Sequence, residues 1–123
     1  MSKIKYSTMG DTHVKIPLQI IENISLFDNT LRLRIIKELL NHIESLDESA
    51  KDWGYLKKDL RLKLGIKHEA NFHESLKSLE RIGLIRMFSY DNKSGKPVGI
   101  ILNSDEYYDY SEIINYFLKK HNL

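Results

Sequence analysis

Three stretches with helical apolar spacing, two of them closed by a single glycine, constrain the fold of this chain most strongly. The first stretch follows the capping residues 28–30, the second runs from Trp53 to Gly65, and the third ends at Gly83. Glycine directly after an apolar-periodic stretch is typical of a left-handed helix C-cap. The apolar positions of the three stretches are, in order, Leu31, Ile35, Ile36, Leu39, Leu40, Ile43 and Leu46; Trp53, Leu56, Leu60 and Leu64; and Phe72, Leu76 and Leu79. The pattern predicts three consecutive amphipathic helices with short connections.

Two short strands and a last helix are predicted after Gly83. Residues 84–90 and 98–102 have the composition of strands, and the turn-forming segment 91–96 between them predicts a β-hairpin with a basic tip. Ser104 or Asp105 is the expected N-cap of the last helix, whose anions lie near its start and whose cations lie near its end, as the helix dipole favours.

The amino-terminal segment gives weaker signals. Residues 1–11 are short and polar, which predicts a loose arm. Residues 13–16 alternate polar and apolar side chains, which predicts a short extended segment that Pro17 ends. The segment 18–27 is compatible with either a short helical turn or an extended connector.

Composition excludes several classes of protein. The chain has no cysteine, which excludes disulfides, thiol nucleophiles and thiolate zinc sites. His68 and His73 are five residues apart, whereas two histidines that bind zinc from one face of a helix are four apart. No metal or cofactor is therefore expected. The six glycines stand alone, without a phosphate-binding loop, and there is no nucleophile elbow, so we expect no enzyme and no small-molecule ligand. No apolar run reaches the roughly 20 residues of a membrane span, and the expected location is the cytoplasm, or a host cytoplasm for a viral or plasmid-borne protein.

Charge is unevenly distributed, although the formal net charge is only +2. Residues 54–67 carry five cations and one anion, whereas residues 104–116 carry four anions and no cation. This distribution indicates one face offered to a polyanion and another kept away from it.

The order of elements resembles the winged helix-turn-helix superfamily of DNA-binding proteins. The resemblance is carried by Leu60, Leu64-Gly65-Ile66, Leu76, Leu79 and Gly83-Leu84-Ile85, and it covers roughly residues 30–103. It implies an α+β, mostly helical fold with an extra C-terminal helix. The corresponding division is an arm with a short strand (1–17), a winged-helix domain (18–103) and a C-terminal helix (104–123).

The resemblance implies that the third helix enters the major groove of double-stranded DNA. Arg81 or Lys77 would then donate to guanine, Asn71 to adenine, and Glu74 would accept from cytosine. The second helix would contact phosphates, and the hairpin would contact the adjacent minor groove. The expected DNA-binding residues are Lys57, Lys58, Arg61, Lys67, Asn71, Glu74, Lys77, Ser78, Arg81, Arg86, Lys93 and Lys96.

Three roles are compatible with this pattern. The first is sequence-specific transcriptional regulation. The second is a replication-initiation module, because residues 13–17 resemble the entry strand of plasmid and phage initiator winged helices. The third is a protein-interaction module without DNA binding, because Glu69, Glu74 and Glu80 outnumber the cations of the third helix.

The dense aromatic set of the last helix predicts a homodimer, with closure of the monomer's own core as the alternative; its members are Tyr107, Tyr108, Tyr110, Tyr116 and Phe117.

Overall fold

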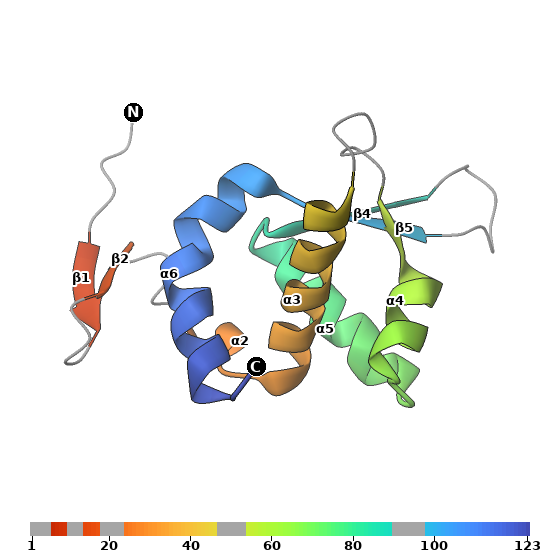
Figure 1. Ribbon diagram of the computed structural model, residues 1–123, viewed down its shortest axis with the longest axis horizontal. Coiled ribbons are helices and arrows are strands. Elements are labelled where there is room, and N and C mark those ends of the chain that lie inside the picture. The colour runs from red at the N-terminus through yellow and green to blue at the C-terminus, as the bar shows by residue number, and fades with distance from the viewer. Residues whose placement is uncertain (1–5, 10–13, 18–23, 47–53, 90–97) are drawn as a thin grey trace.

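The computed structural model describes residues 6–9, 14–17, 24–46, 54–89 and 98–123. The structure is mostly helical, and a small three-stranded antiparallel sheet lies at one edge beside the helices (Figure 1). The elements are β1 (Tyr6–Met9), β2 (Val14–Pro17), α2 (Ile24–Phe27), α3 (Thr30–Ser45), β3 (Tyr55–Leu56), α4 (Lys57–Leu64), α5 (Glu69–Arg81), β4 (Ile85–Ser89), β5 (Val98–Leu102) and α6 (Ser104–Lys120). The α+β, mostly helical class predicted from the sequence is therefore confirmed.

Helix α3 is the central helix of the core. The side chain of Asn29 accepts a hydrogen bond of 3.0 Å from the backbone N–H of Arg32, so one of the predicted capping residues starts this helix. Ile35, Ile36 and Leu39 are buried as their spacing predicted. Leu33 is also fully buried, although it lies outside the predicted stripe, because α3 is covered on more than one side.

The second predicted helix is shorter than the sequence indicated. Tyr55 and Leu56 form strand β3, which pairs with β5, and α4 begins only at Lys57. The prediction that Leu56 lies on a helical face is therefore wrong, because strand pairing with β5 overrides the apolar spacing. Trp53 lies outside the described residues.

Glycine ends both later helices in the way that the sequence predicted. Gly65 has φ 65° at the end of α4, and Gly83 has φ 81° just after α5. Helix α5 buries Phe72, Leu76 and Leu79 completely, which confirms its apolar stripe.

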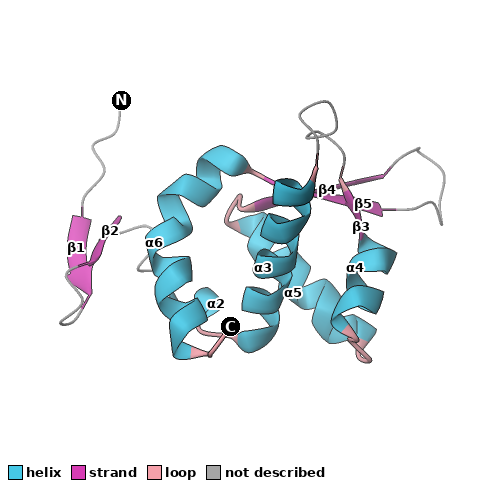
Figure 2. Ribbon diagram, in the orientation of Figure 1, coloured by secondary structure: helices cyan, strands magenta, loops and turns pink. Residues whose placement is uncertain are grey.

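The sheet has the strand order β3-β5-β4, and helices α3, α4 and α5 lie to one side of it (Figure 2). Strands β4 and β5 pair antiparallel from Ile85↔Leu102 to Ser89↔Val98, as the predicted hairpin requires. The Phe88 ring lies over Gly99, where an added Cβ would come within 2.5 Å of the ring, so this position has no room for a side chain.

Helix α6 closes the same core with Tyr110, Ile113, Ile114 and Phe117. Its N-cap is Asn103, not Ser104 or Asp105, and no side chain caps it. The Asn103 amide instead donates to the Gly83 carbonyl at 2.6 Å, because the start of α6 packs against the turn that follows α5.

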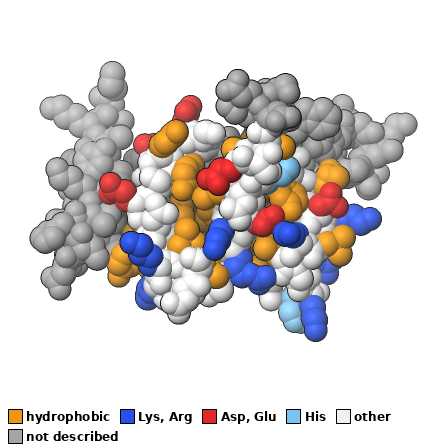
Figure 3. Space-filling model, in the orientation of Figure 1, with side chains coloured by type: hydrophobic (Ala, Val, Ile, Leu, Met, Phe, Trp, Pro, Cys, Tyr) orange, Lys and Arg blue, Asp and Glu red, His pale blue; other side chains and the backbone are white. Residues whose placement is uncertain are grey.

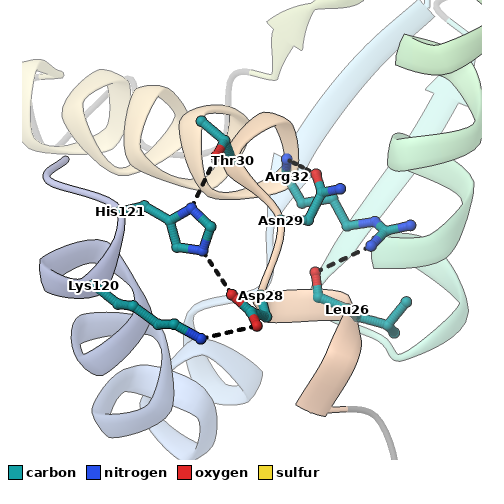
Figure 4. Close-up of polar contacts among 7 residues, drawn as sticks. All are labelled: Leu26, Asp28, Asn29, Thr30, Arg32, Lys120 and His121. Atoms are coloured by element: carbon teal, nitrogen blue, oxygen red, sulfur yellow. Dashed lines mark hydrogen bonds and ion pairs between the residues drawn. The ribbon is translucent and has the colours of Figure 1, made fainter.

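The carboxyl end of α6 is tied to the start of α3 (Figure 4). Asp28 accepts hydrogen bonds from His121 at 2.7 Å and from Lys120 at 3.0 Å, and Thr30 lies 2.8 Å from the other ring nitrogen of His121. Hydrogen bonds from His121 and then Lys120 lower the pKa of the Asp28 carboxyl below its ordinary value. The cluster joins residues that are more than ninety positions apart in the sequence.

The amino-terminal segment forms a separate two-stranded sheet. Strand β1 pairs antiparallel with β2, so the prediction of a loose arm over residues 1–11 is wrong for Tyr6–Met9, whereas the extended segment before Pro17 is confirmed from Val14 onward. This hairpin lies beside α6, which β2 contacts (Figure 1). Of the two alternatives for residues 18–27, the short helical turn is confirmed for Ile24–Phe27, which form α2, and residues 18–23 lie outside the described residues.

Candidate nucleic-acid interface

Helix α5 presents an exposed face opposite its buried stripe. Ala70, Glu74, Lys77 and Arg81 are exposed along this face, and Asn71 is exposed at its edge. Ser78 is half-buried, and its hydroxyl donates to the Glu74 carbonyl at 2.9 Å. The helix is held by packing on one side and open on the other, which leaves four of its five predicted DNA-binding side chains accessible.

Two of the glutamates of α5 face other elements and not its exposed face. Glu80 accepts a hydrogen bond of 2.9 Å from the backbone N–H of Met87, and so it binds the edge strand β4. A Glu69 carboxylate oxygen lies 3.9 Å from the Arg61 guanidinium. Only Glu74 remains on the face that Lys77 and Arg81 share, so the face is less acidic than the helix as a whole.

The cations of α4 differ in their freedom. Lys58 is exposed, whereas the Lys57 ammonium lies 3.0 Å from Nδ1 of His73 on α5. The contact draws the start of α4 toward α5 and leaves Lys57 and Lys58 beside each other at one end of the helix. The Lys58 ammonium is therefore free to take up several positions, whereas the Lys57 ammonium is held beside His73.

Arg61 binds the turn between α4 and α5. Its Nε donates to the Ile66 carbonyl at 3.1 Å, and its terminal nitrogen donates to the Lys67 carbonyl at 3.0 Å. Arg34 of α3 donates to the Leu64 carbonyl beside them. The Arg34 bond satisfies a carbonyl at the end of α4 that the helix itself leaves unpaired, and the Arg61 bonds hold the turn that sets the angle between the two helices.

A cleft of about 870 Å³ opens between α4, the first turn of α5 and the start of β5. Its apolar walls include Leu56, Leu62, Ile66 and Val98, and the buried Phe72 lies at its floor. Its charged lining residues are Lys57, Lys58, Asp59, Arg61 and Glu69. We refer to it as the α4–α5 cleft. Figure 3 shows Lys and Arg side chains together with apolar surface over α4.

The remaining predicted residues lie around these elements. Lys67 is exposed in the turn before α5. Arg86 is exposed on β4, with its guanidinium 6.0 Å from the centre of the Phe88 ring. Lys93 and Lys96, at the predicted hairpin tip, lie outside the described residues.

Sequence reasoning missed the contributions of His73 and Glu80. From the sequence, His73 is expected at the surface or in a helix cap, and Glu80 counts as an unfavourable charge on the third helix. The spacing of Phe72, Leu76 and Leu79 places both residues on one flank of α5. Periodicity alone does not show that this flank faces α4 and β4.

Grouped metal ligands and membrane-spanning helices are both absent from the part of the chain that the structure describes. Within them, no three histidine or acidic side chains are grouped as metal ligands would be. None of the described helices has both the length and the apolarity needed to cross a bilayer.

Comparison with solved structures shows a likeness of fold. A protein from Methanosarcina mazei Go1 described as a possible transcriptional regulator matches with a TM-score of 0.54 and 14% sequence identity. The match covers 96% of this chain and 90% of that chain, so it includes the terminal elements as well as the central helices. No protein-family model and no curated protein matches the sequence.

Proposed function

We propose that this protein is a winged helix-turn-helix protein that binds double-stranded DNA and regulates transcription. Helix α5 would lie in the major groove, and the hairpin of β4 and β5 would form the wing. The order of α3, β3, α4, α5, β4 and β5, with β3 paired to β5, supports this reading, and so does the fold likeness to a possible transcriptional regulator.

One observation carries the proposal. Helix α5 exposes Asn71, Glu74, Lys77 and Arg81 while Arg61 and Arg34 fix the turn that sets its angle to α4. A reading helix needs both an open polar face and a rigid support, because base contacts depend on close positioning. Lys57 and Lys58 would contact the phosphates that flank the groove.

The test is binding to labelled random-sequence duplex, measured by fluorescence anisotropy at several salt concentrations. Phosphate contacts predict a linear fall of log affinity with log salt, with a slope of about −0.9 for each contact. Lys58→Ala should reduce affinity for all sequences and lower the slope by about 1. Arg81→Ala should instead change the preferred sequence, by about 1–3 kcal/mol at the base that it contacts.

Lys63→Ala is the matched control for Lys58→Ala, because Lys63 is an exposed lysine of the same helix that does not line the α4–α5 cleft. Absence of binding at low salt by folded protein would refute the proposal and favour the protein-interaction role. Equal, sequence-independent effects of Lys58→Ala and Arg81→Ala would refute the assignment of α5 as reader.

The replication-initiation role gains no specific support from the structure. Strand β2, which contains most of the segment that resembles an initiator entry strand, pairs with β1 and not with the three-stranded sheet. Selection of bound genomic fragments separates the two roles, since sites in promoters indicate regulation and clustered repeats near an origin indicate initiation.

A further inference from the structure

Two large apolar side chains are highly exposed in the described part of the chain, and each lies among charges of mainly one sign. Leu62 of α4 is 69% exposed, and Tyr108 of α6 is 76% exposed. Single exposed apolar residues are common on protein surfaces. An apolar residue surrounded by charges of one sign is a more specific feature, because it has the composition of an interface anchor with a charged rim.

The surface around Tyr108 is a single helical stripe. Asp105 lies three and four residues before Tyr108 and Asp109, and Glu112 lies four and three residues after them, so all four share one side of the helix, and all four are exposed. No lysine or arginine occurs from Ser104 to Tyr116. We call this stripe the α6 ridge; its eight residues, 105–112, span roughly 10 Å along the helix.

The surface around Leu62 is the α4–α5 cleft. Its apolar walls can accommodate an aromatic ring. Its charged lining consists of three cations, Lys57, Lys58 and Arg61, and two carboxylates, Asp59 and Glu69, so a net positive charge remains although Glu69 lies 3.9 Å from the Arg61 guanidinium. Arg61 is already held by the Ile66 and Lys67 carbonyls, so little of its freedom remains to be lost on binding. A ligand for this cleft should be short, apolar at its centre and acidic at its edges.

The α6 ridge has this composition, but it cannot reach the cleft of its own chain. Figure 1 shows α6 and α4 on opposite sides of the molecule, separated by α3 and α5. The cations at the far end of α6 are not an equivalent partner, because Lys120 and His121 already bind Asp28 and Lys119 does not line the α4–α5 cleft. The two surfaces can therefore meet only between two copies of the chain.

We propose that the α6 ridge of one copy docks in the α4–α5 cleft of a second copy. Tyr108 would enter between Leu62 and Ile66, and Asp105, Asp109 and Glu112 would face Lys57 and Lys58. The contact joins two different surfaces, so each added copy leaves one ridge and one cleft open and assembly is head-to-tail. The surfaces are small, which predicts weak association that depends on protein and salt concentration.

This inference does not depend on nucleic acid, and its test uses the free protein. Sedimentation velocity of the full chain at low salt, about 50 mM, should show an average sedimentation coefficient that rises with protein concentration, and about 500 mM salt should return it to the monomer value. A cleft variant, Lys58→Glu with Leu62→Ser, and a ridge variant, Tyr108→Ser with Asp109→Asn, should each lose at least tenfold in association constant.

An equimolar mixture of the two variants gives the sharpest result. The intact ridge of the cleft variant should bind the intact cleft of the ridge variant, which yields a one-to-one dimer and nothing larger. Lys63→Glu, which changes the same charge on α4 outside the cleft, should associate as the original protein does. All substituted side chains are exposed, and circular dichroism verifies that each variant is folded.

Three results would overturn the proposal. The first is a chain that stays monomeric at low salt and high concentration. The second is a cleft variant that associates like the original protein while the ridge variant does not, which would indicate pairing of α6 with α6. The third is a mixture of variants that stays monomeric.

Discussion

Replacement of Arg61 by alanine tests whether this residue positions α5 or contacts DNA directly. The substitution removes two hydrogen bonds from the guanidinium to the Ile66 and Lys67 carbonyls, at 3.1 and 3.0 Å. A hydrogen bond to a charged donor contributes about 1.5–3 kcal/mol when buried. The Arg61 side chain is 36% exposed and water can reach the freed carbonyls, so we expect a total loss of about 1–2 kcal/mol in the free energy of unfolding.

Urea unfolding followed by circular dichroism measures this loss, and a melting temperature lower by roughly 3–12 °C should accompany it. Arg61→Lys should fall between Arg61→Ala and the original protein, because one ammonium group cannot reproduce the two-sided geometry of the guanidinium. Lys63→Ala is the matched control and should change stability by less than about 0.5 kcal/mol. Unchanged stability of Arg61→Ala together with weaker DNA binding would refute the positioning role and restore the direct phosphate contact that the sequence predicted.

Three further substitutions test other contacts. Gly99→Ala places a Cβ 2.5 Å from the Phe88 ring and should lower the free energy of unfolding by about 1–3 kcal/mol. A second change, Phe88→Leu, should recover part of the loss. An unchanged urea midpoint for Gly99→Ala would contradict this packing. Glu80→Ala leaves the Met87 N–H without its acceptor and should lower the free energy of unfolding by about 1–2 kcal/mol. Glu80→Gln keeps an acceptor and should lower it less. Equal losses in both variants would show that the charge of Glu80, and not its hydrogen bond, matters. Asp28 has a lowered pKa in the folded chain, so its stabilising contribution is present above pH 3.8, the ordinary value of the group, and is lost as the pH falls below it toward the folded pKa. The stability difference between Asp28→Asn and the original protein should therefore shrink in acid, and a difference that stays constant with pH would contradict the role of the His121 and Lys120 hydrogen bonds.

Local signals in the sequence were sufficient for most of the helices and for one hairpin. Asn29 caps α3, Gly65 and Gly83 take up positive φ angles, and β5 spans the predicted residues, because each of these features depends on a few neighbouring residues. The strand at Tyr55 and Leu56 was missed because two residues carry no usable periodicity. Only the pairing with Gly99 and Ile100, more than forty residues later, makes them a strand.

Composition does not predict which aromatic residues of α6 are buried and which are exposed. Tyr107, Tyr108 and Tyr110 have the same side chain within four positions, but Tyr110 is buried in the core and Tyr108 is 76% exposed. Burial and then Glu44 raise the pKa of the Tyr107 hydroxyl, which places it between these two environments. Of the aromatic set from which a homodimer was predicted, Tyr108 is the member left exposed, because Tyr107, Tyr110, Tyr116 and Phe117 pack against the core of the chain, and the homodimer stays a prediction.

The sequence by itself determined most of the helical segments, the glycines that end α4 and α5, and which face of α5 is apolar, because helix periodicity, capping and glycine conformation act over fewer than about ten residues. The tertiary structure alone decided what the polar side chains do. Arg61 binds carbonyls across the turn, Glu80 binds an edge strand, and His73 meets Lys57 of another helix. These contacts depend on which flank of a helix faces which neighbour, and that arrangement is fixed only when the separate apolar stripes pack into one core.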